Sequence, residues 1–378
     1  MDVMWCISCN MPVAIGSKCP KCGLTASTVS TNDGEVRPAF PADIRRIRDA
    51  VDAFHGDGCG AALIPDGGIA VIVRTTDSEA VVVNGAVALK LSYTGGVPTA
   101  YMTLAGLRMI AGSITAHKVV CTHDATHFAK MGRSLMASGV ASVDDAVSKG
   151  DRVAVIGDSG KVVAVGIAKM DASGMRESGN GVAVGIKEAH GARFHDEGQS
   201  PTWMDLIELN SKAITGAATG ASGYPRSNIV RKNLRSAVLY TGDIRSEAVA
   251  LLALDAGLGT VLIPEEGSFD KEAYGFIRFY AEGKGMQIVD GRISFGSLLP
   301  SMREYGASVC LTGERIPTSP MDVPGIKGMR VICPIKDWTP LMPWLFLMLR
   351  KEPLAPQYMR GDRYPYSRDP MMPGNRFG

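Results

Sequence analysis

The sequence has no apolar run near the ~20 residues that a membrane-spanning helix needs, so a membrane protein is not expected. Residues 1–23 lack both the basic and the apolar region of a secretory signal, and we expect a cytoplasmic protein. A net charge of only +2 means that any nucleic-acid surface must be a local patch. No Gly-x-Gly-x-x-Gly follows a predicted strand with an acidic residue ~20 positions later, which argues against a dinucleotide oxidoreductase.

The composition is that of a folded protein with several domains. Of 378 residues, 46% are hydrophobic and 21% are charged, which permits sizeable cores and excludes a disordered chain. A chain of this length usually forms about two to four domains. The 44 glycines and 21 prolines predict short elements that are joined by many turns.

Two closely spaced cysteine pairs lie near the start of the chain, Cys6 with Cys9 and Cys19 with Cys22. Each Cys-x-x-Cys directs two thiolates at one point, and together they match the sulfur ligands of a structural zinc ion with no open coordination position. We therefore predict a zinc ribbon over residues 1–25. Two disulfides are the alternative, which a reducing cytosol disfavours. The other cysteines have apolar neighbours and are predicted core residues: Cys59, Cys121, Cys310 and Cys333.

Residues 35–115 have the pattern of a small α+β domain. Apolar residues at helical spacing predict a helix over 41–54, and Asn84-Gly85 is a strong hairpin signal. Short β-rich runs predict strands at 61–64, 69–73, 80–83 and 86–91. No catalytic cluster is found in this stretch.

Residues 117–191 alternate in hydrophobicity with frequent turns, which predicts a compact β-barrel with a strand at 119–121 and a short helix at 125–130. The loop 132–140, the Lys149-Gly150-Asp151 turn and the strand 163–168 resemble the PUA domain, an RNA-binding module of archaeal and eukaryotic RNA-modification enzymes. The resemblance implies that this loop lies close to RNA, with glycines allowing close approach and basic residues meeting phosphate. The implied RNA-binding residues are Lys130, Gly132, Arg133, Ser134 and Gly139. A barrel that serves only as a spacer is the alternative.

Residues 192–235 are predicted to be a mostly polar linker. It contains a helical segment at 203–210 and a flexible Gly/Ala/Thr/Ser stretch at 216–223. Four basic residues and no acidic residue then fall within ten positions: Arg226, Arg231, Lys232 and Arg235. Such a run is usually a solvated face, but beside an RNA-binding module it could extend a basic track.

Strands and helices alternate over residues 236–350. We predict strands at 237–240, 260–263, 287–289, 308–312 and 329–333, and helices at 246–256, 270–282 and 339–349. This pattern favours a doubly wound α/β sheet with ligands at the carboxyl ends of its strands.

The tail, 351–378, is basic, aromatic and rich in proline, and is predicted to be extended. Its arginines and aromatic residues suit RNA binding, although an ordinary frayed terminus fits the composition equally well.

The α/β region resembles the phosphoadenosine phosphosulfate (PAPS) reductase family, a branch of the PP-loop ATP pyrophosphatases with an adenine nucleotide α-hydrolase-like fold. The resemblance rests on the strand-turn-helix at 237–256, on the segment with Gly313 and Arg315, and on residues 334–339 and 344–346. Archaeal members carry a zinc ribbon and a PUA domain ahead of the reductase-like domain, and the order here is similar. The segments 35–40 and 43–44 are similar too.

The phosphate loop departs from the family pattern Ser-Gly-Gly-x-Asp-Ser. Here the loop reads Thr241, Gly242, Asp243, Ile244, Arg245 and Ser246. Asp243 puts a negative charge where a glycine admits phosphate, and Arg245 reverses the charge of the family's aspartate. The family's cysteine pairs for iron–sulfur or thiol chemistry are also missing. We expect a catalytically degenerate domain that does not bind nucleotide.

Two functional hypotheses follow. The first is an RNA-binding protein, associated with tRNA or with rRNA in the ribosome, that is built on a degenerate reductase-like scaffold. The second is an active PP-loop enzyme, either an RNA sulfurtransferase or a sulfonucleotide reductase. Only the second needs a working phosphate loop.

Overall fold

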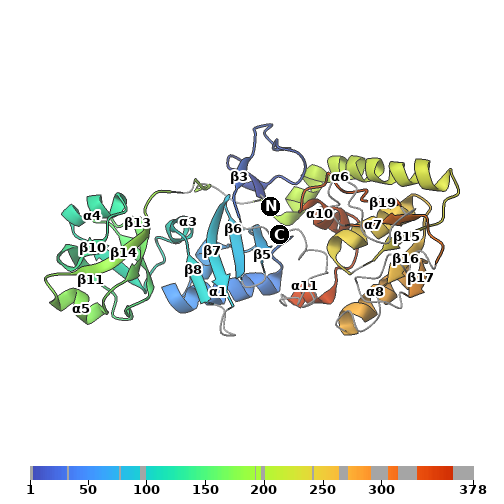
Figure 1. The fold of residues 1–378 in the computed structure, drawn as a ribbon. Helices are drawn as coiled ribbons and strands as arrows, with labels where there is room; N and C mark the ends of the chain where they lie inside the picture. The colour runs from blue at the N-terminus through green and yellow to red at the C-terminus, as the bar shows by residue number, and fades with distance from the viewer. Residues whose placement is uncertain are drawn as a thin grey trace. The chain divides into compact units, whose positions relative to one another are not determined.

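The structure is a computed structural model, shown as a ribbon in Figure 1. It describes residues 3–31, 34–75, 78–93, 99–191, 193–196, 201–240, 242–263, 271–290, 305–313 and 330–360. The chain divides into two compact units. The first comprises Met1–Val13 and Ser17–Leu206, and the second comprises Ala14–Gly16 and Ile207–Gly378.

The first unit begins with a three-stranded antiparallel ribbon in the order β2–β1–β3. Its strands are β1 (Val3–Cys6), β2 (Met11–Pro12) and β3 (Ser27–Val29). The Asn10 amide donates to Asn84 Oδ1 at 2.9 Å. A Cβ on Gly85 would lie only 2.4 Å from Ile7 Cδ1, so the ribbon packs directly on the Asn84-Gly85 turn.

The ribbon is followed by a five-stranded antiparallel sheet with strands in chain order, β4 to β8. Asn84 and Gly85 have φ of 50° and 81°, so the predicted hairpin turn is confirmed. Its strands are β4 (Glu35–Pro38), β5 (Ala70–Arg74), β6 (Ser78–Val83), β7 (Ala86–Ser92) and β8 (Thr99–Met102). Its helices are α1 (Pro41–His55), α2 (Cys59–Leu63) and α3 (Leu104–Met109).

The strand predicted at 61–64 is wrong, because these residues belong mostly to helix α2. A run of four apolar residues fits a strand or a buried helical turn equally well, and only tertiary contacts decide. Here Gly60 lies against the backbone of α1, where a Cβ would come within 2.4 Å of Arg48 Cα. The Arg48 guanidinium donates to the Ile64 carbonyl and so closes the end of the helix.

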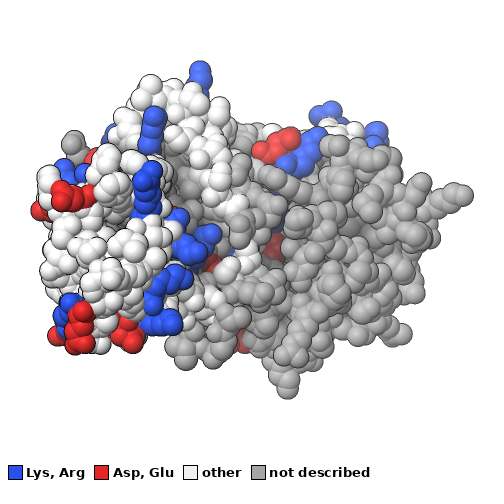
Figure 2. Space-filling view, turned by 60° about the vertical axis from the view of Figure 1, so that its left-hand side comes forward, with Lys and Arg blue, Asp and Glu red and all other residues white. Residues whose placement is uncertain are grey.

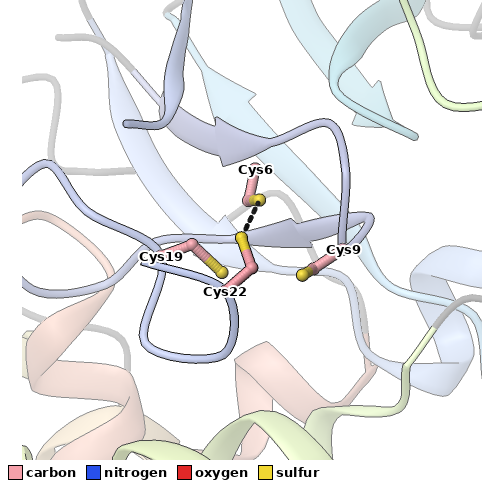
Figure 3. A group of neighbouring side chains, drawn as sticks. All are labelled: Cys6, Cys9, Cys19 and Cys22. Carbon is pink, nitrogen blue, oxygen red and sulfur yellow. Dashed lines mark hydrogen bonds between the residues drawn. The ribbon is translucent and has the colours of Figure 1, made fainter. Parts of the chain in front are cut away.

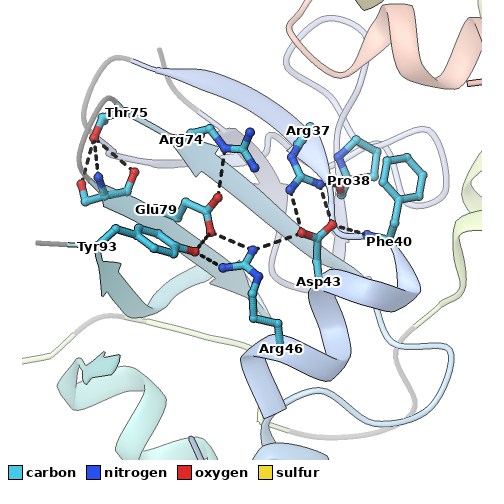
Figure 4. Close-up of polar contacts among 10 residues, drawn as sticks. Arg37, Pro38, Phe40, Asp43, Arg46, Arg74, Thr75, Glu79 and Tyr93 are labelled. Carbon is cyan, nitrogen blue, oxygen red and sulfur yellow. Dashed lines mark hydrogen bonds and ion pairs between the residues drawn. The ribbon is translucent and has the colours of Figure 1, made fainter. Parts of the chain in front are cut away.

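A network of buried charges joins α1 to this sheet (Figure 4). Arg37 binds the Asp43 carboxylate through both terminal nitrogens at 2.6 and 2.7 Å. Arg46 bridges Asp43 and Glu79 at 3.1 and 2.9 Å, and Arg74 pairs with Glu79 at 2.9 Å. The side chains of Arg37, Asp43 and Glu79 are completely buried, so the network replaces part of an apolar core.

The third part of the first unit is a six-stranded sheet in the order β10–β14–β13–β12–β9–β11. The two edge strands are separated in sequence only by a 3-10 turn, Ala137–Gly139, so the sheet forms a nearly closed barrel. Its strands are β9 (Lys118–Cys121), β10 (Leu135–Met136), β11 (Val140–Val143), β12 (Arg152–Ile156), β13 (Val162–Ala168) and β14 (Val182–Glu188). Helices α4 (His123–Lys130) and α5 (Ala172–Glu177) complete it.

Strands β12 and β13 contribute to two cores. Val153, Val155 and Val163 lie in the barrel core. Ala154 and Val165 point the other way, into the core that the α+β domain forms around α1 and α3. Because both faces of these strands are buried, the α+β domain and the barrel pack as one body within the first unit.

Helix α6 (Trp203–Pro225) shows that the flexible stretch predicted at 216–223 is wrong. Glycines in a helix cost roughly 1 kcal/mol each, but packing can outweigh this cost. Leu206, Ile214 and Ala221 are buried at helical spacing, which supplies that packing. A π-helical turn, Arg226–Val230, follows directly, so the predicted linker is largely helical in its second half.

The second unit holds a parallel sheet in the order β17–β16–β15–β18–β19. The order reverses beside β15, as in a doubly wound sheet, where ligands bind at the carboxyl ends of the strands flanking the reversal. Its strands are β15 (Ser236–Leu239), β16 (Thr260–Ile263), β17 (Gln287–Asp290), β18 (Val309–Leu311) and β19 (Arg330–Ile332). Its helices are α7 (Ile244–Asp255), α8 (Lys271–Gly283), α10 (Met342–Leu349) and α11 (Pro356–Arg360). None of the helices in the described ranges combines the length and the apolar character needed to cross a membrane.

Candidate functional sites

The cysteine pairs of the ribbon come together at one point (Figure 3). The sulfur atoms of Cys6, Cys9, Cys19 and Cys22 all lie within 4.8 Å of one another, and Cys6 Sγ is 3.6 Å from Cys22 Sγ. Sulfur atoms 2.3 Å from a tetrahedral metal ion would be about 3.8 Å apart, so the spacing fits such a site. The four cysteines could therefore hold a metal ion.

The surroundings of these sulfurs differ in polarity. Burial raises the pKa of the Cys6 thiol, and burial with hydrogen bonds to neighbouring thiols raises the pKa of Cys9 to about 12. The Leu24 backbone amide lowers the pKa of the exposed Cys22 to about 7. A bound cation would favour the thiolate form of all the sulfurs, because metal binding releases their protons.

The loop after α4 is an exposed part of the barrel with a basic residue on either side of Gly132. Helix α4 begins at the N-cap Thr122 and ends at Lys130. Gly132 has φ of 78° and Arg133 N donates to the Phe128 carbonyl at 3.1 Å, which reverses the chain and holds the loop against the helix. We call the exposed residues 130–134 the α4 loop surface.

Four of the five residues predicted to bind RNA lie in this surface: Lys130, Gly132, Arg133 and Ser134. Gly139 does not. It is half-buried, and a Cβ there would come within 2.7 Å of Ala125 Cβ, so its glycine is explained by packing of the 3-10 turn on α4.

Sequence reasoning missed the exposed apolar residues beside this loop. The Arg133 guanidinium carbon lies 5.7 Å from the centre of the Phe128 ring, whose residue is 47% exposed. Met131 and Met136 are also exposed, and Met136 pairs with the exposed Val182 across β10 and β14. The helical spacing of α4 could have indicated the exposure of Phe128, because Phe128 falls on the face opposite the buried Thr126 and Ala129.

The start of α4 carries a further basic residue. His123 contacts the Asp158 carboxylate, and this hydrogen bond raises the pKa of the exposed imidazole. His123, His127 and Lys130 follow one another at helical spacing along α4 and are all exposed. Figure 2 shows Lys and Arg side chains in a broken band on the side of the molecule at the left, with Asp and Glu towards its margins.

The predicted phosphate loop follows β15 in the second unit, and Thr241 and Arg315 lie outside the described residues. Asp243 is the N-cap of α7, and its carboxylate accepts hydrogen bonds from Arg245 N at 2.8 Å and Ser246 N at 3.1 Å. Arg245 Nε donates to the Gly313 carbonyl at 2.6 Å. The structure therefore brings Gly242–Ser246 and Gly313 together between the ends of β15 and β18.

A buried carboxyl group lies one turn further along α7. Glu247 is 2% exposed, and burial raises its pKa well above the ordinary value, with the charges of Glu352 and Asp243 adding to the effect. Tyr240, at the end of β15, is equally buried, and its hydroxyl has no hydrogen-bond partner in the described part of the chain. The interior behind the predicted phosphate loop therefore holds a carboxyl group whose environment favours the protonated form.

Comparison with known proteins identifies one part of the chain. Residues 117–190 match the PUA domain family, so the barrel of the first unit is a PUA domain. No curated protein matches the chain.

Several solved structures resemble part of the chain. A hypothetical protein from the archaeon Pyrococcus horikoshii is 19% identical, with a TM-score of 0.34, over 41% of this chain and 93% of its own. A conserved PUA domain protein from Thermoplasma acidophilum is 21% identical, with a TM-score of 0.33, over 42% and 96%. The archaeal box H/ACA sRNP Nop10–Cbf5 complex is 28% identical, with a TM-score of 0.19, over 19% of this chain and 23% of its own. These scores are too low to establish a shared fold, so the PUA assignment rests on the family match.

Proposed function

We propose that this protein binds structured RNA through the α4 loop surface of its PUA domain. The RNA would be tRNA or rRNA, and the rRNA could be part of the ribosome. The observation that carries the proposal is a continuously exposed stretch, residues 130–134, that holds the two basic residues Lys130 and Arg133 in a domain of this family. Neither Lys130 nor Arg133 pairs with a carboxylate in the described part of the chain. Both charges are therefore available to phosphate.

The loop offers three kinds of contact to RNA. Gly132, with its left-handed backbone, lets the chain approach a phosphate without a side chain in between. Lys130 and Arg133 supply positive charge. The exposed Phe128 ring, with the Arg133 guanidinium beside it, offers a flat surface on which an unpaired base can stack.

The test is a titration of a fluorescein-labelled tRNA transcript with the full-length protein at several salt concentrations, followed by fluorescence anisotropy. If both side chains contact phosphate, Lys130→Ala with Arg133→Ala weakens binding. The slope of log K against log salt then falls by roughly 0.7 to 0.9 for each phosphate that is no longer neutralised. Arg45→Ala with Lys90→Ala is the matched control, because it removes two exposed cations from the α+β domain. A double variant that binds like the wild type would favour the spacer hypothesis.

The ribbon's metal ion is zinc in this proposal. Four sulfur donors in a closed set are typical of structural zinc, and the ribbon by itself has few apolar residues to bury. Cys6, Cys9, Cys19 and Cys22 would hold the ion and fix the two turns relative to each other. The zinc would supply folding energy and no catalytic chemistry.

The second unit acts, in this proposal, as a degenerate reductase-like scaffold without nucleotide. The amides of a helix N-terminus bind phosphate only when they are free, and here the Asp243 carboxylate already accepts from two of them. A phosphate would have to displace this carboxylate and tolerate its charge. The sulfurtransferase or sulfonucleotide reductase alternative requires that displacement.

Isothermal titration calorimetry with ATP, AMP and PAPS tests this part of the proposal, and we expect no binding. Arg245 is the side chain best placed to hold an anion, since it lies between the α7 N-terminus and Gly313. Micromolar binding of any of the three nucleotides, abolished by Arg245→Ala, would favour the enzyme.

A further inference from the structure

A second basic surface lies in the α/β unit, on the edge of the sheet opposite the predicted phosphate loop. It consists of Arg231, Lys232, Arg235 and Tyr305, and we call it the amino-edge surface. Arg235 immediately precedes β15, and Tyr305 lies a few residues before β18. The two strands are parallel neighbours, so their amino ends lie side by side.

Backbone hydrogen bonds hold the segment that carries these cations. Arg231 N donates to the Arg226 carbonyl and Leu234 N to the Ile229 carbonyl, which are the five-residue hydrogen bonds of a π-helical turn. The Ile229 side chain is buried and anchors the turn. Arg231, Lys232 and Arg235 are all exposed beyond it. The anchored turn therefore holds a short cationic segment on the surface.

Arg235 and Tyr305 form a cation–π pair, which we call the Arg235–Tyr305 stack. The guanidinium carbon lies 4.1 Å from the centre of the tyrosine ring. The Arg235 carbonyl accepts a hydrogen bond from Ser308 N at 2.9 Å, so the backbones that carry the two side chains are also joined. Gly306 stands beside the stack with φ of 75°, and a Cβ there would lie 3.5 Å from the guanidinium. These contacts hold the guanidinium beside the tyrosine ring before any ligand binds.

The charge of this surface is not neutralised within the described ranges. Other arginines of the second unit have carboxylate partners, such as Arg350 with Asp255 and Arg360 with Glu272. Arg231, Lys232 and Arg235 make no ion pair with any described residue. Arg226, by contrast, donates to the Asp255 carbonyl at 2.6 Å and is less available.

We propose that the amino-edge surface is a second RNA-contacting site, at which Arg231 and Lys232 meet phosphates and the Arg235–Tyr305 stack receives an unpaired base. This inference rests on the proposed function, because it takes RNA to be the ligand of this protein. A planar guanidinium on an aromatic ring matches the flat face of a base, and the flanking cations match the backbone on either side of it.

The test uses the full-length protein with the same labelled tRNA transcript. Arg231→Ala, Lys232→Ala and Arg235→Ala together should weaken binding. They should also lower the salt slope by roughly 1.4 to 1.8 units, at 0.7 to 0.9 for each of the two phosphates that Arg231 and Lys232 neutralise in the wild type. Tyr305→Leu should leave the slope unchanged and weaken binding by at least about fivefold, the lower end expected for the removal of one stacked base. Lys212→Ala, at an exposed position of α6, is the control.

The outcomes separate the two proposals. If the triple variant matches the wild type at every salt concentration while the Lys130 and Arg133 variant weakens binding, the amino-edge inference fails and the proposed function stands. If only the triple variant weakens binding, the amino-edge site stands and the role of the α4 loop surface fails. If the wild type binds neither the tRNA nor an RNA hairpin at low salt, both proposals fail.

Discussion

Replacing Asp43 with asparagine should destabilise the α+β domain more than any other single isosteric change in the buried network of Figure 4. The carboxylate accepts from both terminal nitrogens of Arg37, from Phe40 N at 3.0 Å and from Arg46 at 3.1 Å. Asparagine keeps the shape but loses the charge, and its amide group must face one of the guanidinium donors. Arg37 is then a completely buried cation without its partner.

The expected cost is about 3 to 5 kcal/mol, which is typical when one member of a buried ion pair is removed. Domains of ordinary stability unfold with about 5 to 15 kcal/mol, so much of the stability would be lost. Asp49→Asn is the matched control, because Asp49 is exposed on the same helix and should cost about 0.5 kcal/mol or less.

Hydrogen exchange followed by mass spectrometry is the appropriate assay, because a single melting temperature is not well defined for a chain with several domains. Amides of α1 and β4 should lose protection in Asp43→Asn, while those of the parallel sheet should not. Equal protection of α1 in the Asp43 and Asp49 variants would refute the reasoning.

The ion pair also sets the direction of the pH dependence. Burial alone would raise the pKa of Asp43, but the hydrogen bonds and charge of Arg37 hold it below the ordinary value. The stabilisation is therefore complete above the pKa of the unfolded chain, near 3.9, and is lost as the pH falls through the lower folded value. The difference between wild type and Asp43→Asn should shrink on strong acidification.

Three further predictions concern other parts of the chain. A chelator should remove about one zinc per chain and deprotect β1 to β3, and Cys19→Ser should do the same; a zinc-free protein with a protected ribbon would contradict this. Above about pH 4.5, only the unfolded Glu247 carboxyl ionises, because its pKa in the folded protein is raised. The free energy of unfolding of Glu247→Gln should therefore exceed that of the wild type by about 1.4 kcal/mol more for each pH unit, until the folded pKa is reached. Denaturant unfolding from pH 4 to 8 checks it, and a gap that does not change with pH refutes it. Gly85→Ala, with φ of 81° and a Cβ 2.9 Å from Trp5 Cδ1, should weaken the packing between ribbon and hairpin, measured as faster exchange in β1.

Features that depend on local chemistry could be read from the sequence. The Asn84-Gly85 turn follows from the backbone angles that only such residues adopt easily, and the cysteine pairs follow from the geometry of Cys-x-x-Cys turns. The alternating strands of the barrel were also found, because their pattern has a short period and turns mark their ends.

Features that depend on distant contacts could not be read in this way. Helix α6 keeps its glycines although they disfavour a helix, and Ile214 on this helix is buried; no local pattern reports that burial. The buried pair of Arg37 and Asp43 falls in a segment noted for its family resemblance, yet its letters alone do not show that both charges are shielded from water. Burial of polar groups is decided by what packs over them.

The predicted phosphate loop shows how the same residue can be read in two ways. From the sequence, Asp243 opposes phosphate through its charge. In the structure its carboxylate is also the N-cap of α7 and takes the amides that a phosphate would need. Two substitutions of Asp243 separate the effect of its charge from the effect of its capping hydrogen bonds. Asparagine would remove the charge but keep a capping oxygen, whereas glycine would free the amides and lose the cap. Loss of charge alone is therefore not enough to make these amides available to an anion, because the capping oxygen would still occupy them.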